Sequence, residues 1–351
     1  MGRPKRNWAI FFILSSIIIW SACSPTSLDP VGSALQNAST PLEIPTYDGS
    51  EQATEPDVAV FDMPWHGFRY WMAVSPYPFA DQSKENPSIF ASNDGQTWQV
   101  PPGVTNPLAL PVGTNYLSDA SIFYDKASDQ LWVYYNVTYG FKPQPITGLG
   151  LIRLVSSDGS HWHSDGEILH TAPCEVTSPT VAQVGDVYFL WSIALLNCDV
   201  WGHTTVTYRT SADGLIWSDP KPTSMSIPGY MIWHINVAYI PSKNEWWGAV
   251  AAYPVGQPCC EATSLFFARS KDGIQWISYK TPILTPAPLS WDNKTIYRSS
   301  LLFDSQSNHL KVWYSGMNTQ GAWGIGFAEE DCDRLIDWLM QMEGGLTPGP
   351  W

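Results

Sequence analysis

The chain has 351 residues, with 32 acidic against 18 basic side chains and a formal net charge of −14. A chain of this length that is 44% hydrophobic can bury a substantial core, which excludes a disordered or collagen-like protein. The negative charge argues against nucleic acid as a partner, because phosphate backbones are bound mainly through lysine and arginine. Only 14% of the residues are charged while 19 are tryptophan, which favours aromatic-rich β-structure.

The first residues of the chain predict an export signal. A basic stretch at residues 3–6 precedes an uncharged run at 8–20, which is shorter than the about 20 residues that a membrane-spanning helix needs. The run ends in Ser21-Ala22-Cys23, which resembles a bacterial lipobox. Residues 1–22 are therefore expected to be a lipoprotein signal peptide, with Cys23 as the lipidated new N-terminus. An ordinary secretory signal is the alternative.

The predicted location follows from this signal. The protein is expected to be exported and held at the bacterial cell surface or at the periplasmic face of a membrane, touching the membrane through its lipid alone. Residues 24–52 are rich in Ser, Thr, Pro, Asn and Gly, so residues 23–52 are expected to form the lipid anchor and a flexible linker.

A repeated heptapeptide, Ser-x-Asp-Gly-x-x-Trp, sets the expected fold. It begins at Ser92, Ser156, Ser211 and Ser270, and a degenerate fifth copy lies near 326–330. Such a period indicates a repeat architecture, and each unit reads as four short strands with turns between them. The Asp-Gly pair suits a tight turn and the Trp suits packing between units, so the motif is given a structural role.

The expected fold class is therefore all-β: a five-bladed β-propeller over residues 53–331, with four antiparallel strands in each blade. Apolar residues spaced as on one helical face predict a short amphipathic helix in the C-terminal segment, residues 332–351.

Functional groups on a propeller are expected just before the first strand of each blade or in the long loop between its second and third strands, because loops carry function on a rigid scaffold. The segments before the five first strands supply a ring of polar side chains: Glu55 and Asp57, Asp119, Glu175, His234 with Asn236, and Arg298. Two carboxyl groups that flank a glycosidic bond can hydrolyse it, so the ring suits glycoside chemistry. The alternative at each position is a turn residue, a core histidine or a paired arginine.

The repeat resembles the Asp-box of sialidases, although here Asp and Gly are adjacent. Together with Tyr297-Arg298-Ser299-Ser300 and the segment 323–328, it is similar to the five-bladed glycosidases of the arabinanase, levansucrase and invertase superfamily, including glycoside hydrolase family 43. That resemblance implies Glu175 as the acid, Asp119 as the carboxylate that tunes its pKa, and Glu55 or Asp57 as the base.

These observations predict a surface-anchored, family 43-like glycoside hydrolase acting on oligosaccharides or polysaccharides. A carbohydrate-binding propeller without catalysis and a protein-binding module are the alternatives. Sugar rings stack on aromatic faces, so the long loops complete the expected substrate site. The predicted substrate-binding residues are Tyr77, Glu85, Asn86, Trp201, His234, Asn236, Arg298 and Trp323.

Cysteines are expected to form disulfides in an exported protein. Cys174 and Cys198 are the first choice, while Cys259 and Cys260 either join each other or one of them reaches Cys332. No cysteine spacing resembles a zinc site, so no metal ligands are assigned and no cofactor is expected. An axial Ca²⁺, as in some members of the superfamily, is left open. A carbohydrate is the expected partner, and the protein is expected to be a monomer.

Overall fold

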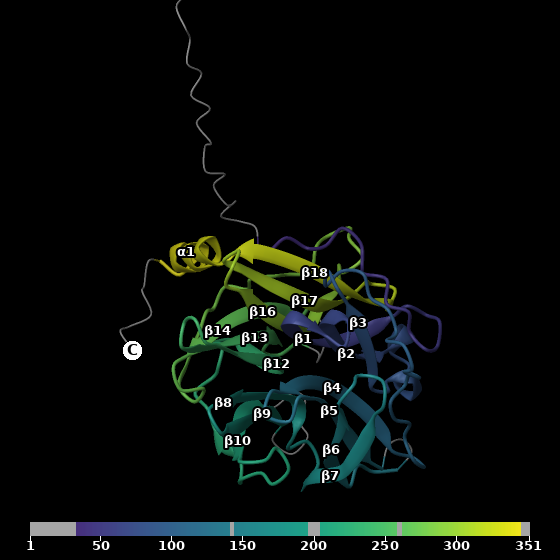
Figure 1. Ribbon diagram of the computed structural model, residues 1–351. Coiled ribbons are helices and arrows are strands. Elements are labelled where there is room, and N and C mark those ends of the chain that lie inside the picture. The colour runs from purple at the N-terminus through teal and green to yellow at the C-terminus, as the bar shows by residue number, and fades with distance from the viewer. Residues whose placement is uncertain (1–32, 141–143, 196–203, 258–261, 345–351) are drawn as a thin grey trace, which may run out of the picture. The chain divides into compact units, whose positions relative to one another are not determined.

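The computed structural model describes residues 33–140, 144–195, 204–257 and 262–344. Its strands form five separate antiparallel sheets around a central axis, as Figure 1 shows, which confirms the predicted five-bladed β-propeller. The blades in chain order are β1 (Ala53–Trp65), β2 (Phe68–Pro76) and β3 (Ser88–Ser92); β4 (Tyr116–Asp125), β5 (Gln130–Tyr139), β6 (Gly148–Ser156) and β7 (His163–Thr171); β8 (Thr177–Val184), β9 (Val187–Leu195), β10 (Thr204–Ser211) and β11 (Lys221–Pro222); β12 (Tyr230–Ile240), β13 (Glu245–Pro254), β14 (Ser264–Ser270) and β15 (Trp276–Ser278); and β16 (Thr295–Asp304), β17 (His309–Met317) and β18 (Trp323–Asp331).

The remaining regular elements are short. Two 3-10 turns, η1 (Pro78–Ala80) and η2 (Gln82–Lys84), lie in the loop between β2 and β3. The expected C-terminal helix is α1 (Cys332–Met342), which buries Leu335 and Leu339. No helix of the described residues is both long and apolar enough to cross a bilayer.

Blades one and five depart from the expected four strands, because each has three among the described residues. In blade one the chain after the Asp94 turn forms a single bridge, between Ala91 and Gln99, before it leaves the sheet. In blade five Asp331 caps helix α1 by accepting bonds from two backbone amides, so the chain turns into a helix where a fourth strand would begin.

The repeated heptapeptides have the structural role that the sequence predicts. In the first copy Asp94 Oδ1 accepts hydrogen bonds from the amides of Gln96 and Thr97, and Ser92 Oγ accepts from Gly95. Gly95 has a φ of +76° and lies against Trp313 of blade five. The other three copies repeat both features, so each turn glycine packs under a tryptophan of the preceding blade.

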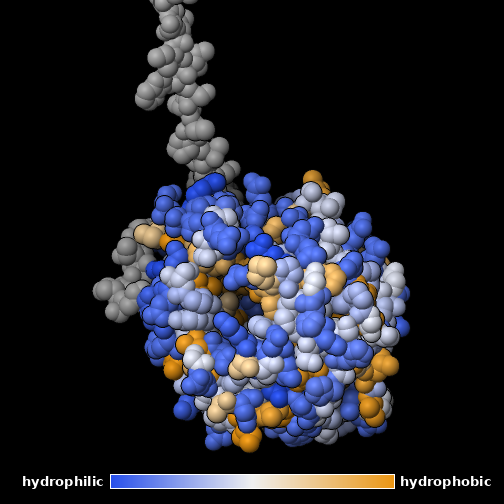
Figure 2. Space-filling model, viewed as in Figure 1, coloured by the Kyte–Doolittle hydropathy of each residue, from blue (hydrophilic) through white to orange (hydrophobic). Residues whose placement is uncertain are grey.

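The innermost strands position the candidate site. β1, β4, β8, β12 and β16 contact one another in a closed ring, and Figure 2 shows the viewed face hollowed near its middle. The first three of these strands carry a bulge near their start, with positive φ at Glu55, Asp119 and Ser178. A bulge redirects a side chain, so these three residues occupy equivalent positions facing the axis.

The segment before β1 corrects the expected flexible linker for residues 33–52. Leu35 and Ile44 are fully buried, and the amide of Leu42 donates to the carbonyl of Ile325 on β18 at 2.7 Å. These apolar side chains bury surface against the blades, so the polar composition of the segment does not keep it unfolded. Residues 1–32, including the predicted signal peptide and Cys23, lie outside the described part of the chain.

Candidate functional site

Three blades bring two carboxylates and a histidine together at the start of the inner strands. Glu55 lies on β1, Asp119 on β4 and His234 on β12, and each is at least nine-tenths buried. Oxygen and nitrogen atoms from these three residues all lie within 4.8 Å of one another. Glu55 Oε2 also accepts a bond of 2.9 Å from the backbone amide of Asp119, which ties blade one to blade two.

Among the described residues no group forms a hydrogen bond with either ring nitrogen of His234, although both nitrogens are buried. Its Nδ1 lies 3.5 Å from Asp119 Oδ1, a distance longer than a normal hydrogen bond. Burial lowers the pKa of His234 to about 3, so the imidazole is neutral at physiological pH and its nitrogen lone pair can bind a ligand. Buried polar groups usually find a partner, and at this position both ring nitrogens lack one among the described residues.

Two buried glutamates in this region, Glu55 and Glu85, have raised pKa values. Burial, and next the charge of Asp119, raise the pKa of Glu55 to about 8. Glu85 is also buried, and Tyr116 donates a hydrogen bond to its carboxyl group. Burial and then the charge of Glu55 raise the pKa of Glu85 well above its usual range. Glu85, predicted as a substrate-binding residue, therefore lies within the electrostatic reach of the cluster.

Arg298 is fully buried, where the sequence predicted a side chain that binds the substrate. Its Nη2 donates to the carbonyl oxygen of Pro179 at 2.6 Å, and its Nη1 lies 3.5 Å from Asp119 Oδ1. Nε has no partner. The guanidinium thus supplies a fixed positive charge beneath the cluster and braces blade three against blade five.

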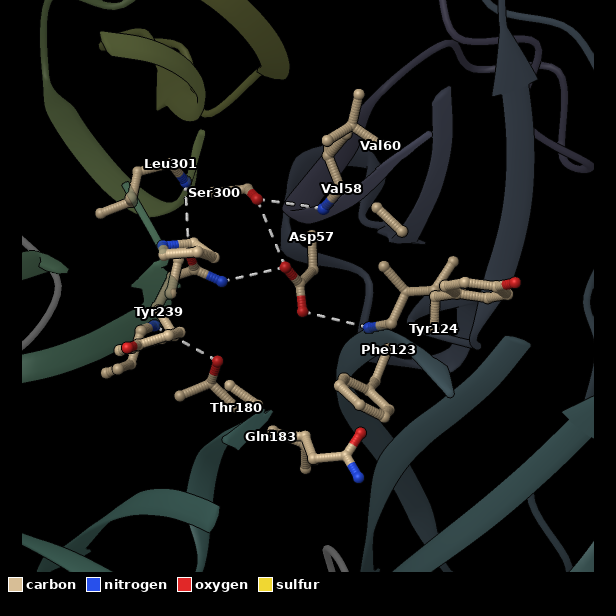
Figure 3. A pocket seen from close by; sticks show the side chains of 18 residues that line it. Asp57, Val58, Val60, Phe123, Tyr124, Thr180, Gln183, Tyr239, Ser300 and Leu301 are labelled. Atoms are coloured by element: carbon tan, nitrogen blue, oxygen red, sulfur yellow. Dashed lines mark hydrogen bonds between the residues drawn. The ribbon is translucent and has the colours of Figure 1, made fainter. Parts of the chain in front are cut away.

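Asp57 and Asn236, predicted as a base and a substrate ligand, form a second and separate site. Asp57 accepts bonds from the hydroxyl of Ser121, the amide of Ile122, the side-chain amide of Asn236 and the hydroxyl of Ser300. Asp57 lines an open cavity of about 450 Å³ that the inner strands surround. Figure 3 shows its carboxylate hydrogen-bonded to groups of the surrounding strands. Every bond of Asp57 is to the protein itself, so the residue joins four blades.

Glu175, predicted as the acid, is exposed in the segment before β8 and is not a member of the cluster. The equivalent of Glu55 and Asp119 in blade three is Ser178, three residues later. Its hydroxyl is fully buried and bonds to the backbone of Ile235. Blade three therefore brings no carboxylate to the axis among the described residues.

An arc of aromatic rings borders the cluster on one side. Tyr297 lies 4.3 Å from the His234 ring, Trp323 lies 5.2 Å from Tyr297, and Tyr77 lies 5.8 Å from Trp323, measured between ring centroids. Trp233 donates a hydrogen bond to the hydroxyl of Tyr297. Tyr77 and Trp323 were predicted from the sequence, and the structure places them side by side.

Other predicted site residues lie elsewhere or outside the described part. Asn86 is buried and bonds through its side-chain amide to Tyr47 and to the carbonyl of Ser83, which is a structural role. Trp201 lies outside the described residues. Cys198, Cys259 and Cys260 do too, so the pairing of Cys174 with Cys198 stays a prediction. Cys332 is a buried free thiol in the described part of the chain, so the alternative bridge from Cys259 or Cys260 to Cys332 is not formed.

Sequence reasoning missed three residues that the structure brings to this region, Tyr116, Trp233 and Tyr297. The last two adjoin His234 and Arg298, which the sequence did single out. Tyr116 carried no signal, because it pairs with Glu85 only after blades one and two have packed together.

The donor set of the cluster suits a divalent cation. The prediction of no metal ligand rested on cysteine spacing, whereas Glu55, Asp119 and His234 offer two carboxylate oxygens and one imidazole nitrogen from three blades. Imidazole and carboxylate are common ligands of zinc, manganese and related ions. A cation would also fill the coordination that the unpartnered His234 lacks and would neutralise the neighbouring carboxylates.

The fold and the cluster together define the class: a five-bladed β-propeller with a buried group of carboxylates and a histidine at one end of its axis. No protein-family model matches the chain. It is 28% identical, over 96% of its own length, to the A type blood N-acetyl-α-D-galactosamine deacetylase of Flavonifractor plautii. The chain spans about half the length of that curated relative, which it covers to 53%.

Solved structures agree with this relationship. The N-acetylgalactosamine deacetylase of F. plautii, in complex with blood group B trisaccharide, superposes with a TM-score of 0.79 at 26% identity, covering 89% of this chain and 99% of that one. The β-1,2-mannobiose phosphorylase of Listeria innocua has a TM-score of 0.58 at 13% identity, covering 90% and 95%. A thermostable family-43 glycoside hydrolase has a TM-score of 0.56 at 11% identity, covering 80% and 88%, and these last two share the fold alone.

Proposed function

We propose that this chain is a carbohydrate-active hydrolase that removes the acetyl group from an N-acetylated amino sugar, with Glu55, Asp119 and His234 holding a divalent cation. The observation that carries the proposal is His234, a buried and neutral imidazole with no hydrogen bond beside two carboxylates. The similarity to a deacetylase over nearly the whole chain supports it.

The charges of the buried residues favour a divalent ion. Glu55, Asp57, Glu85 and Asp119 are four buried carboxyl groups in this region, and Arg298 is a cation beside them. An ion of charge +2 added to the guanidinium balances three ionised carboxylates, and the fourth carboxyl group, Glu85 in this proposal, keeps its proton. Because isolated charges are costly to bury, this balance favours the metal-bound state.

The reaction adds water across an amide bond: the carbonyl carbon gains an oxygen, the C–N bond breaks, and acetate and an amine leave. A divalent cation supplies Lewis acidity to such a step, polarising the carbonyl or lowering the pKa of water. Arg298 holds Asp119 in place, and the Tyr297 ring covers one side of His234. The leaving amine must take up a proton. The buried Glu85 carboxyl, whose pKa is raised well above its usual range by burial and then by the charge of Glu55, is the proposed donor.

Glycoside hydrolysis, predicted from the resemblance to family 43, fits the geometry less well. Glycosidases place their two carboxyl groups about 5–5.5 Å apart when they retain the anomeric configuration and about 6.5–9.5 Å apart when they invert it. The Glu55 and Asp119 oxygens in the cluster lie within 4.8 Å, and the blade-three position holds Ser178 in place of a carboxylate. A carbohydrate-binding propeller without catalysis would use the same pocket.

One experiment separates these functions. The full chain is incubated with an oligosaccharide ending in N-acetylgalactosamine, and released acetate and new reducing ends are measured together, with and without a chelator. We expect acetate release that the chelator abolishes and added Mn²⁺ or Zn²⁺ restores. New reducing ends would indicate a glycosidase, and substrate binding without either product would indicate a binding protein.

A further inference from the structure

The segment Ser33–Gln52, called the clasp below, runs from blade four across blade five to blade one. At its start the amide of Leu35 donates to the carbonyl of Ile283, and Asn37 Nδ2 donates to Asp292 Oδ2 at 2.7 Å. Further on, the hydroxyl of Tyr314 accepts a bond from the clasp at 2.8 Å. The clasp is therefore bonded to the blades along its length.

The position of the clasp matters because the propeller must close between blade five and blade one. Each of the five sheets is built from strands of one blade only, so no described strand is shared between blades one and five. The clasp lies on the outer edge of β18 and then reaches the loop after β2. It supplies backbone hydrogen bonds that join these two blades.

Gln52, the last residue of the clasp, joins the two blades at the rim of the candidate site. Its side-chain oxygen accepts from the amide of Phe79 and from the amide of Trp323, each at 3.1 Å. Its backbone carbonyl accepts from the amide of Tyr77 at 2.9 Å. One residue therefore fixes both segments that carry the outer aromatic pair, Tyr77 and Trp323.

A second contact links the clasp to the acidic side of the site. The hydroxyl of Tyr47 donates to the carbonyl of Lys84 at 2.9 Å and accepts from Asn86 Nδ2 at 2.8 Å. Glu85 lies between these two residues, so Tyr47 clamps the turn that places Glu85 beside Tyr116.

We propose that the clasp is part of the functional domain and that Gln52 is a positioning residue, which holds Tyr77 and Trp323 together as a wall for the sugar next to the acetylated one. The substrate class implied is an oligosaccharide rather than a free amino sugar, because the wall extends outward from His234 through Tyr297. The sugar-binding part of this inference rests on the proposed function, whereas the positioning of the two segments does not.

The test uses two substitutions of similar size in the full chain. Gln52→Glu keeps the accepting oxygen and Gln52→Met removes it. We expect Gln52→Met to raise KM for the oligosaccharide by about three- to tenfold with kcat within about twofold, since two modest hydrogen bonds are lost. Gln52→Glu is expected to have a KM within about twofold of the wild type. With free N-acetylgalactosamine as the substrate, the wild type and both variants are expected to have the same KM.

Hydrogen exchange of the same proteins tests positioning without any substrate. Protection of the amides of Phe79 and Trp323 is expected to fall in Gln52→Met and to persist in Gln52→Glu. Asn37→Ala is the control, because it loosens the far end of the clasp; it is expected to lower Tm without changing KM. Equal KM and equal protection in all variants would overturn the inference, while a wild type inactive on every acetylated sugar with altered protection in Gln52→Met would overturn only the proposed function.

Discussion

The central channel holds two acidic sites on one ring of strands, and they differ in how their polar atoms are bonded. Asp57 accepts four hydrogen bonds from three other blades. His234, nearer the start of the strands, has none on either nitrogen from the described residues. The Asp119 carboxylate beside it accepts bonds from Ser118 and Asn136, at 3.1 and 3.2 Å, and lies 3.5 Å from both His234 and Arg298. A buried carboxylate whose bonds are all made within the fold stabilises structure, whereas an imidazole without partners can take a ligand.

Backbone conformation separates the two sites as well. Glu55 and Asp119 have positive φ values of 60° and 56°, while Asp57 lies beyond the bulge in regular strand. Non-glycine residues in that region are strained, and such strain gathers at functional positions. The two sites therefore differ in backbone conformation as well as in hydrogen bonding.

The largest expected effect comes from disrupting the cluster of Glu55, Asp119 and His234. Asp119→Asn removes one ligand charge while keeping shape, so we expect acetate release to fall by about 10²- to 10³-fold. Isothermal titration should show a parallel loss of Mn²⁺ affinity, and circular dichroism should show an unchanged fold. Retention of both metal affinity and activity in this variant would contradict the assignment of the cluster.

Asp57 is expected to behave in the opposite way. Asp57→Asn replaces one accepting carboxylate oxygen with an NH2 donor, so either Ser121 and Ile122 or Asn236 and Ser300 lose their acceptor. This change should lower the free energy of unfolding by about 2–3 kcal/mol. Activity per folded molecule should stay within about threefold of the wild type. Urea unfolding and acetate release measure the two quantities, and a stable but inactive variant would return Asp57 to the catalytic group that the sequence suggested.

The sequence predicted the fold better than the site, for physical reasons. The Asp-Gly turns are local, so their spacing revealed the blades, and the residues before each inner strand could be gathered at one axis. The bulges could not be seen, because they depend on pairing with the neighbouring strand. They decide that Ser178 rather than Glu175 faces the axis in blade three, and that Asp57 joins blades while Glu55 joins the cluster.

The linker and the metal ligands were missed for related reasons. Composition predicted a flexible segment at 33–52, but its few apolar residues, Leu35 and Ile44 among them, find buried positions on blades that lie far away in sequence. The donors Glu55, Asp119 and His234 come from three blades, so no short spacing marks them. Long-range contacts create both features.

The glycines of the outer turns are expected to set the packing between neighbouring blades, independently of the central channel. Gly159 has a φ of +73°, and a Cβ added at this residue would lie 2.1 Å from the Trp71 ring. We expect Gly159→Ala to lower the free energy of unfolding by about 2–3 kcal/mol. The control Gly166→Ala, at φ +85° with open space around it, should cost about 1 kcal/mol. Equal losses in thermal unfolding would mean that the turn glycines do not set the packing between blades.

The last expected effect is the pH dependence of stability in chelator-treated protein. The pKa of Glu55 is raised by burial to about 8 from an ordinary value near 4.5, so the folded state binds a proton that the unfolded chain releases. That contribution to stability is present below about pH 4.5 and is lost as pH rises through 8. Asp57 and Glu85, whose pKa values are also raised by burial, act in the same direction.

We therefore expect urea unfolding of the wild type to show stability falling between pH 5 and 8, and Glu55→Gln to reduce that fall by up to about 4 kcal/mol. A saturating divalent cation should reduce it too, because the ion favours ionised ligands and binds only the folded protein. Curves for wild type and Glu55→Gln that run parallel across this range would mean that Glu55 is ionised in the metal-free protein. The charge of Glu55 would then be stabilised by the surrounding protein as well as that of Asp57, and the two acidic sites would no longer differ in this respect.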